Sequence, residues 1–215
     1  MHIVILSDIF GHTDALSHLA EQLQNGLEAK QAVTSFAILT PYKDTAVEET
    51  PTFNKEAEAY EYFVEHSSID EYSQLLASYL DDITQTDVVQ AHTTICIIGF
   101  SVGASALWSY AGTFNNQDRS CLKSTKILGF GYYSSQIRKM TDLSPSFPLE
   151  FVFPKHEPHF CIKQVIESIK TNQNPTCRIV DAEHGFMNQY SNNFDGNLLE
   201  QECFLLIEKL SALKD

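Results

Sequence analysis

The stretch Thr94-Ile-Cys-Ile-Ile-Gly-Phe-Ser101-Val-Gly103 carries the clearest structural signal in the chain. Its first half is an apolar run rich in β-branched residues, which predicts a buried strand at 94–100. A glycine-containing turn follows, and small residues then open a helical pattern that extends to about residue 111. Such a strand–turn–helix order around G-x-S-x-G presents a serine hydroxyl above a sheet. We expect glycine at 99 and 103 because side chains there would collide with the neighbouring strand or helix.

Strand and helix patterns alternate along the rest of the chain. Short apolar runs predict five more strands, at 2–7, 33–39, 126–133, 149–153 and 177–180, with Pro154 ending the fifth strand of the chain. Helical spacing predicts helices at 16–23 (ended by Gly26), 55–65, 69–83, 159–170 and 197–213. This alternation indicates an α/β fold: a doubly wound, mostly parallel sheet of about six strands with helices on both faces. We expect residues 1–215 to form a single domain.

Charge and composition limit the partners of this chain. The formal net charge is −14, with only 14 Lys and Arg, so nucleic acid and anionic membranes are not expected as partners. The N-terminal strand lacks the features of a signal peptide, and no apolar run reaches transmembrane length. The five scattered cysteines are typical of reduced core residues. We therefore predict a cytoplasmic protein that binds a small molecule and uses no cofactor; the last helix or an exposed edge strand could form a homodimer.

Residues 42–90 form the most acidic part of the chain and show no clear strand. Six glutamates stand between residues 48 and 65, and two helical patterns cover most of the segment. One interpretation is a solvated helix face. The other is a helical, acidic lid that covers a functional site and disfavours anionic substrates.

Polar residues follow several predicted strands, and the carboxyl ends of parallel strands meet at one edge of a sheet, where ligands bind. Ser101, Glu157 and His184 come from three such ends, in the chain order of an α/β-hydrolase triad. A serine hydroxyl needs a base to remove its proton, and the imidazole needs a carboxylate to hold its tautomer. Asp181 is a second candidate for the acid, although it lies on the same strand as the histidine.

Other residues at these strand ends complete a candidate site. The backbone N–H groups of Ile9 and Val102 are the natural donors of an oxyanion hole. Asp8 is either a site residue or the cap of the helix that starts near residue 13. Four aromatic side chains can either pack or line a substrate pocket: Phe10, Tyr132, Tyr133 and Phe186.

These residues resemble the dienelactone hydrolases, a branch of the α/β-hydrolases, over nearly the whole chain. Asp8-Ile9-Phe10-Gly11 resembles the family's segment after its first core strand, and Thr40-Pro41-Tyr42 is similar to another family stretch. Gly99–Gly103 matches the nucleophile turn, Gly131-Tyr132-Tyr133 the next strand end, and His184-Gly185-Phe186 the histidine signature. The resemblance implies a Ser101, Glu157 and His184 triad, an oxyanion hole at Ile9 and Val102, and Asp8 beside the nucleophile.

Three departures from the family pattern bear on the substrate. The family uses a cysteine nucleophile and usually an aspartate, where this chain has Ser101 and Glu157. The family also holds a substrate carboxylate with arginines, and the position that matches one of them is Asn188. No arginine occurs in 42–90 either. Because the bidentate clamp is missing, we expect a neutral or cationic small ester, thioester or acyl compound.

The sequence thus predicts a serine hydrolase of dienelactone hydrolase type that acts on a small ester through an acyl-enzyme on Ser101. The alternative is a small-molecule binding protein on a hydrolase scaffold without turnover. His156 and His159 flank Glu157, but their spacing across a proline-containing turn does not favour a metal site.

Overall fold

The fold is built on a six-stranded sheet in which every neighbouring pair of strands is parallel. The computed structural model describes residues 1–32, 34–42, 51–53, 55–85, 93–113, 125–170 and 175–213. In the order of the sheet, the strands are β2 (Ser35–Leu39), β1 (His2–Leu6), β3 (Ile95–Phe100), β4 (Ile127–Tyr132), β5 (Leu149–His156) and β6 (Pro175–Glu183). The predicted α/β fold class is confirmed.

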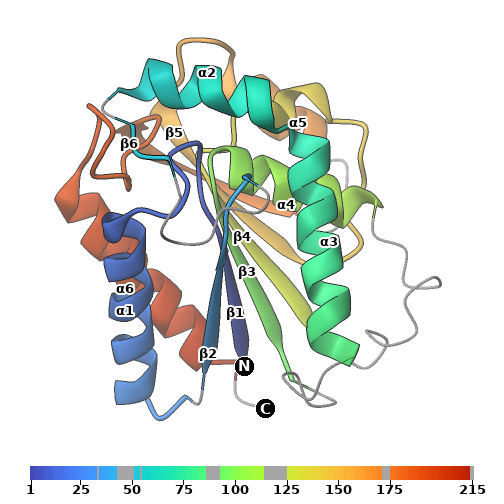
Figure 1. The fold of residues 1–215 in the computed structure, drawn as a ribbon, viewed down its shortest axis with the longest axis vertical. Coiled ribbons are helices and arrows are strands. Elements are labelled where there is room, and N and C mark those ends of the chain that lie inside the picture. Colours follow the sequence, from blue (N-terminus) through green and yellow to red (C-terminus); the bar gives the residue numbers. More distant parts are fainter. Residues whose placement is uncertain are drawn as a thin grey trace.

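Helices cover both faces of this sheet (Figure 1). One face carries α1 (Asp14–Ala29) and α6 (Gly196–Ser211), and the other carries α3 (Ile69–Gln85), α4 (Val102–Thr113) and α5 (Ile162–Ile169). The remaining helices are α2 (Glu56–His66) and the short 3₁₀ helix η3 (Gln136–Lys139). Figure 1 shows α2 lying across the end of the sheet where the strands finish, which is the end that holds the candidate site.

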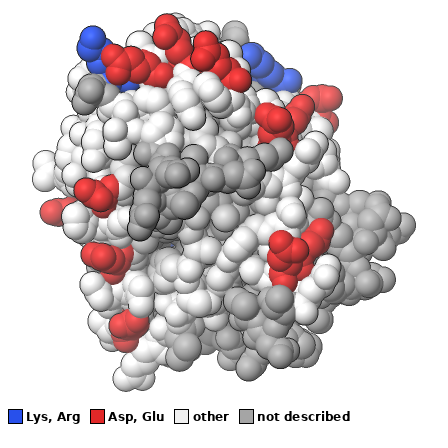
Figure 2. All heavy atoms as spheres, in the orientation of Figure 1, with Lys and Arg blue, Asp and Glu red and all other residues white. Residues whose placement is uncertain are grey.

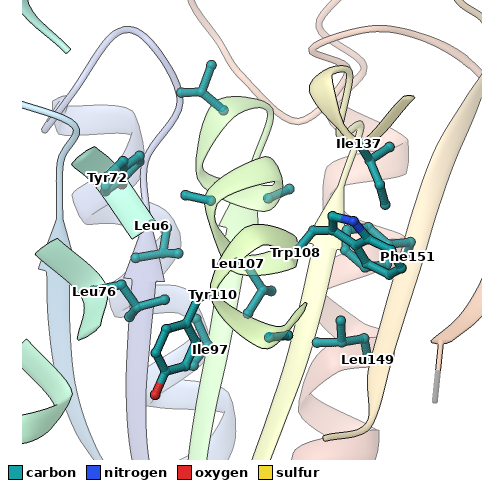
Figure 3. Packing of buried hydrophobic residues seen from close by; sticks show 14 of the residues in the cluster. Leu6, Tyr72, Leu76, Ile97, Leu107, Trp108, Tyr110, Ile137, Leu149 and Phe151 are labelled. Carbon is teal, nitrogen blue, oxygen red and sulfur yellow. The ribbon is translucent and has the colours of Figure 1, made fainter. Parts of the chain in front are cut away.

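The central helix α4 is buried almost all round, which explains why its sequence is apolar on every side. Its Leu107 and Trp108 point toward the sheet and meet Ile97 and Phe151 in a continuous core (Figure 3). Full burial of one such side chain stabilises the fold by about 1.5–3 kcal/mol. This core fixes α4, and therefore the turn that precedes it, against the middle strands.

The first helix departs from its prediction. Gly26 does not end α1, which continues to Ala29. A Cβ atom at Gly26 would lie 2.3 Å from the Ile207 side chain of α6. The glycine therefore permits close packing of two helices, and its presence does not indicate a helix end.

The fifth and sixth strands are longer than expected. Pro154 lies inside β5, which continues to His156 with a register shift against β6. The Val152 carbonyl faces β4, because it accepts a hydrogen bond from Tyr133 N–H. Residues two apart in a strand face the same side, so the Pro154 nitrogen also faces β4, but at a level beyond the last residue of that strand. Proline is tolerated there because no ladder hydrogen bond is lost. β6 likewise extends to Glu183, which places Asp181 within the strand.

Some predictions fall on undescribed positions. The start of the second strand at residue 33, one of the five cysteines (Cys121) and the glutamates at 48 and 49 lie outside the described residues. The four other cysteines are free thiols. Acidic side chains are spread over the face drawn in Figure 2, whereas basic ones stand only near its upper end. No helix in the described parts of the chain has the length and apolar character needed to cross a membrane.

Candidate active site

Ser101 sits in a strained turn between β3 and α4. Its φ is +50°, a left-handed conformation that non-glycine residues seldom adopt. A Cβ atom at Gly103 would lie 2.5 Å from the carbonyl oxygens of Leu6 and Ser7, and one at Gly99 would lie 2.7 Å from the backbone of Gly103 and Ala104. Both glycines are therefore required by close backbone approach, as the sequence indicated.

Three side chains from three strand ends meet above this turn. Ser101 Oγ lies 3.0 Å from His184 Nε2, and His184 Nδ1 lies 2.9 Å from Glu157 Oε2. The Glu157 side chain is only 3% exposed and that of His184 21%. His184 is also fixed through its backbone, because Asn193 Nδ2 donates to its carbonyl oxygen at 3.0 Å. The order hydroxyl, imidazole, buried carboxylate is the order in which a serine is activated.

Asp181 does not take part in this arrangement. Its side chain is 78% exposed and accepts a hydrogen bond from Lys155 Nζ at 3.0 Å. Lys155 holds the pKa of Asp181 below its usual value. Asp181 and His184 are three positions apart, and an extended chain turns such side chains to opposite faces. The carboxylate in contact with the imidazole is Glu157.

The loop after β1 forms part of the same site. Ile9 and Val102 both line the cavity that contains Ser101. Val102 is the first residue of α4, so its N–H is one of the helix-start donors that have no acceptor within the helix. The loop that carries Ile9 is anchored by a hydrogen bond, which the Tyr42 hydroxyl donates to the Ile9 carbonyl. Both predicted oxyanion-hole residues are therefore at the site.

The cavity beside Ser101 measures about 440 Å³, within the usual range for small-molecule sites. It is lined by residues from six parts of the chain: Ile9, Glu56, Tyr60, Ser101, Val102, Ser135, Gln136, Arg138, Glu157, Pro158, His159, Glu183, His184 and Asn193. Of the residues predicted to form a substrate pocket, none lines it.

Three predicted pocket residues are buried in the core on the α1 and α6 face of the sheet. Tyr132 and Tyr133 are 2% exposed and Phe186 is fully buried. The Tyr133 ring packs edge-on against His184 at a centroid distance of 5.2 Å and against Phe186 at 5.3 Å. Of these three rings, that of Tyr133 contacts the imidazole and helps to position it, whereas Tyr132 stacks on Phe100 at a centroid distance of 5.4 Å. All three are packed in the core and leave almost no surface for substrate.

Asp8, Asn188 and Phe10 border other, smaller hollows. Asp8 and Asn188 line a cavity of about 30 Å³ between the β1 loop and α1, and Phe10 lines one of about 120 Å³. Asp8 accepts hydrogen bonds from Phe10 N–H at 3.0 Å and from Asn188 Nδ2 at 2.6 Å. Burial raises the pKa of Asp8 to about 6, while these two hydrogen bonds oppose the rise. Asp8 does not cap α1, because Thr13 does so through its bond from Leu16 N–H.

Several lining residues were missed by sequence reasoning. The segment 135–138, for which the sequence predicts no helix or strand, contributes Ser135, Gln136 and Arg138. Helix α2 contributes Glu56 and Tyr60. One signal was available in the sequence, because 134–139 directly follows a strand whose carboxyl end was expected at the site. Within the described residues, no group of three or more His, Cys, Asp or Glu side chains has a geometry suited to a metal ion.

Sequence comparison finds a distant relative of this chain. No family model matches the sequence. The uncharacterized protein YczH of Bacillus subtilis (strain 168) is 24% identical over 195 residues, which cover 90% of this chain and 84% of YczH.

Solved structures resemble the chain over almost its whole length. Alpha/beta hydrolase domain-containing protein 10 from mouse matches with a TM-score of 0.56 and 10% identity, covering 99% of this chain and 88% of that one. Est1E from Butyrivibrio proteoclasticus matches with a TM-score of 0.57 and 10% identity, covering 98% of this chain and 88% of Est1E. The type II thioesterase YbtT of the yersiniabactin pathway matches with a TM-score of 0.56 and 14% identity, covering 97% of this chain and 91% of YbtT. The chain has the α/β-hydrolase fold. At these identities the likeness shows the fold alone.

Proposed function

We propose that this protein is a serine hydrolase that cleaves a small carboxylic ester or a related acyl bond through an acyl-enzyme on Ser101. The observation that carries the proposal is the continuous contact from Ser101 through His184 to the buried Glu157. The α/β-hydrolase fold of the chain is consistent with it. More specifically, we propose a serine esterase similar to the dienelactone hydrolases. The stretches 8–11, 99–103 and 184–186, which carry the resemblance, support this, because each contributes a residue to the cavity.

The proposed chemistry follows from the geometry. Ser101 Oγ attacks the acyl carbon while His184 Nε2 takes the hydroxyl proton. The negative charge that develops on the acyl oxygen accepts hydrogen bonds from the N–H groups of Ile9 and Val102. His184 then donates its proton to the leaving group. Water, activated by the same imidazole, breaks the acyl–Oγ bond and releases the acid.

We also propose that the acidic segment 42–90 covers part of the site within a single 1–215 domain. Glu56 and Tyr60 of α2 line the cavity with Ser101, and α2 crosses the carboxyl ends of the strands (Figure 1). Tyr60 is 52% exposed, so its ring is available to a ligand. This arrangement supports a lid role for the segment.

The proposal is tested with a fluorophosphonate probe and a panel of short 4-nitrophenyl esters. We expect the probe to label the folded protein at Ser101 and the panel to be hydrolysed. Ser101→Ala should lose both activities, while Ser168→Ala, on α5, should retain them. Failure of the folded protein to be labelled or to hydrolyse any ester would refute the proposal. Tight ligand binding that is unaffected by Ser101→Ala, without turnover, would favour the binding-protein alternative.

A further inference from the structure

An arginine lines the cavity beside the nucleophile. Arg138, the third residue of η3, is the one Lys or Arg among the described residues that line this cavity. Position 188 is Asn, and no arginine occurs within 42–90. The expectation of a neutral or cationic substrate rested on the absence of an arginine from these positions, and Arg138 supplies a guanidinium to the cavity from a different one.

The segment that carries Arg138 is fixed relative to Ser101. Gln136 N–H donates to Ser105 Oγ at 3.3 Å, and Ser105 Oγ donates to the Ser101 carbonyl at 2.9 Å. At the other end of η3, Trp108 Nε1 donates to the Met140 carbonyl at 2.8 Å. Both contacts join η3 to α4, the helix that begins at the nucleophile. Arg138 is thus held on a rigid wall of the cavity, as a preorganised binding group requires.

The guanidinium itself is held, but without a counter-charge. It lies 4.9 Å from the centroid of the Phe160 ring and donates to the Ser135 carbonyl. No carboxylate within the described ranges lies within 4 Å of its nitrogen atoms, whereas Arg178 forms a two-point pair with Glu202. In a chain with 28 acidic and 14 basic residues, a partly buried arginine that lacks an acidic partner is unexpected.

We propose that Arg138 determines substrate specificity by binding a carboxylate of the substrate while the ester bond lies at Ser101. A guanidinium presents N–H donors in a planar fork that matches a carboxylate, and Phe160 behind it keeps the fork oriented. Glu56 and Glu183 also line the cavity, from α2 and the end of β6. They repel an anion placed beside them, so the substrate carboxylate lies on the η3 side. This inference rests on the proposed hydrolysis at Ser101.

The test compares esters that differ only in one charge. The first pair is the 4-nitrophenyl monoester of glutaric acid and 4-nitrophenyl pentanoate, which have equal acyl length. The second pair is 3-carboxy-4-nitrophenyl butyrate and 4-nitrophenyl butyrate, which places the charge on the leaving group. The kcat/KM ratio of anionic to neutral ester, corrected for spontaneous hydrolysis, is measured at low and high salt for the wild type, Arg138→Met, Arg138→Lys and Lys139→Met.

In the wild type we expect at least one ratio above 1, decreasing as salt rises. Arg138→Met should lower that ratio by roughly tenfold to a hundredfold, the effect of losing a charge-assisted hydrogen-bond pair. Arg138→Lys keeps the charge without the planar fork and should give an intermediate ratio. Lys139→Met, an exposed neighbour on the same turn, should leave both ratios within twofold. The proposal would be overturned if both Arg138→Met and Arg138→Lys changed the kcat/KM ratios by less than twofold from the wild-type values.

Calorimetric binding of glutarate to the Ser101→Ala protein separates this inference from the proposed function. If binding depends on Arg138 but the wild type hydrolyses no ester, the anion site stands and the hydrolase proposal fails. If esters are hydrolysed with ratios insensitive to Arg138, the hydrolase proposal stands and the anion site fails. If neither binding nor hydrolysis is observed, both are refuted.

Discussion

Replacing Glu157 with glutamine tests the core of the proposed site, because the change removes one negative charge and keeps the shape. The carboxylate lies 2.9 Å from His184 Nδ1 and is almost fully buried, so its attraction for the imidazolium that forms during catalysis is weakly screened. At a separation near 4 Å and an effective dielectric constant of about 20, that attraction is worth about 4 kcal/mol, or about three orders of magnitude in rate.

The tautomer of His184 adds to this loss. A glutamine amide can donate to Nδ1, which leaves the proton on Nε2, where it blocks acceptance of the Ser101 proton. We therefore expect Glu157→Gln to lower kcat for 4-nitrophenyl acetate by about 10³- to 10⁴-fold. The rate of fluorophosphonate labelling, which reports the same deprotonation of Ser101, should fall in parallel.

Asp181→Asn is the matched control, since it also neutralises one carboxylate near the end of the sheet. Asp181 is largely exposed and pairs with Lys155, so we expect kcat to stay within twofold of the wild type. Circular dichroism and thermal melting of both variants establish that they are folded. A Glu157→Gln enzyme that keeps more than a tenth of the wild-type kcat, or a collapse of kcat in Asp181→Asn alone, would show that the reasoning is wrong.

Three further predictions concern stability. Gly103→Ala places a methyl group 2.5 Å from backbone oxygens at the end of β1 and should lower the free energy of unfolding, measured in urea, by about 2–3 kcal/mol. In the control Gly196→Ala the new methyl group meets no atom closer than 3.7 Å, so the free energy of unfolding should change by less than about 0.5 kcal/mol. Equal effects of the two substitutions would contradict the packing argument. The pKa of Asp8 is about 6 in the folded protein against its usual 3.8, so protonation of Asp8 favours the folded state. Measured relative to Asp8→Asn, the free energy of unfolding of the wild type should be greatest below pH 4 and fall by up to about 3 kcal/mol as the pH rises through 6. A difference between the two proteins that does not change with pH would refute this assignment. Arg178→Met leaves Glu202 buried without its partner and should cost about 3–5 kcal/mol at pH 7, with the double variant Arg178→Met, Glu202→Leu recovering most of the loss in thermal melts.

Much of the fold could be predicted from local pattern. Buried parallel strands are continuous apolar runs and helices carry apolar residues at helical spacing, so the order of elements follows from the chain alone. The turn that holds Ser101 is equally local, because a strained serine and the close approach of two backbones require Gly99 and Gly103 at fixed positions. Local signals failed where a distant element decided the outcome. Gly26 lies within a helix because Ile207 packs on it, and Pro154 lies within a strand because β4 has already ended.

By itself the sequence determined the class of fold, the turn that holds Ser101 and the set of residues that could meet at the strand ends, because each depends on neighbours a few positions away. Only the tertiary structure shows that Glu157, and not Asp181, contacts His184, since this depends on how far β6 extends and which way each carboxylate turns. It also decided that Tyr132, Tyr133 and Phe186 pack in the core while Arg138 lines the cavity. Cavity walls are formed by segments far apart in the chain, and their contact depends on packing of the whole core.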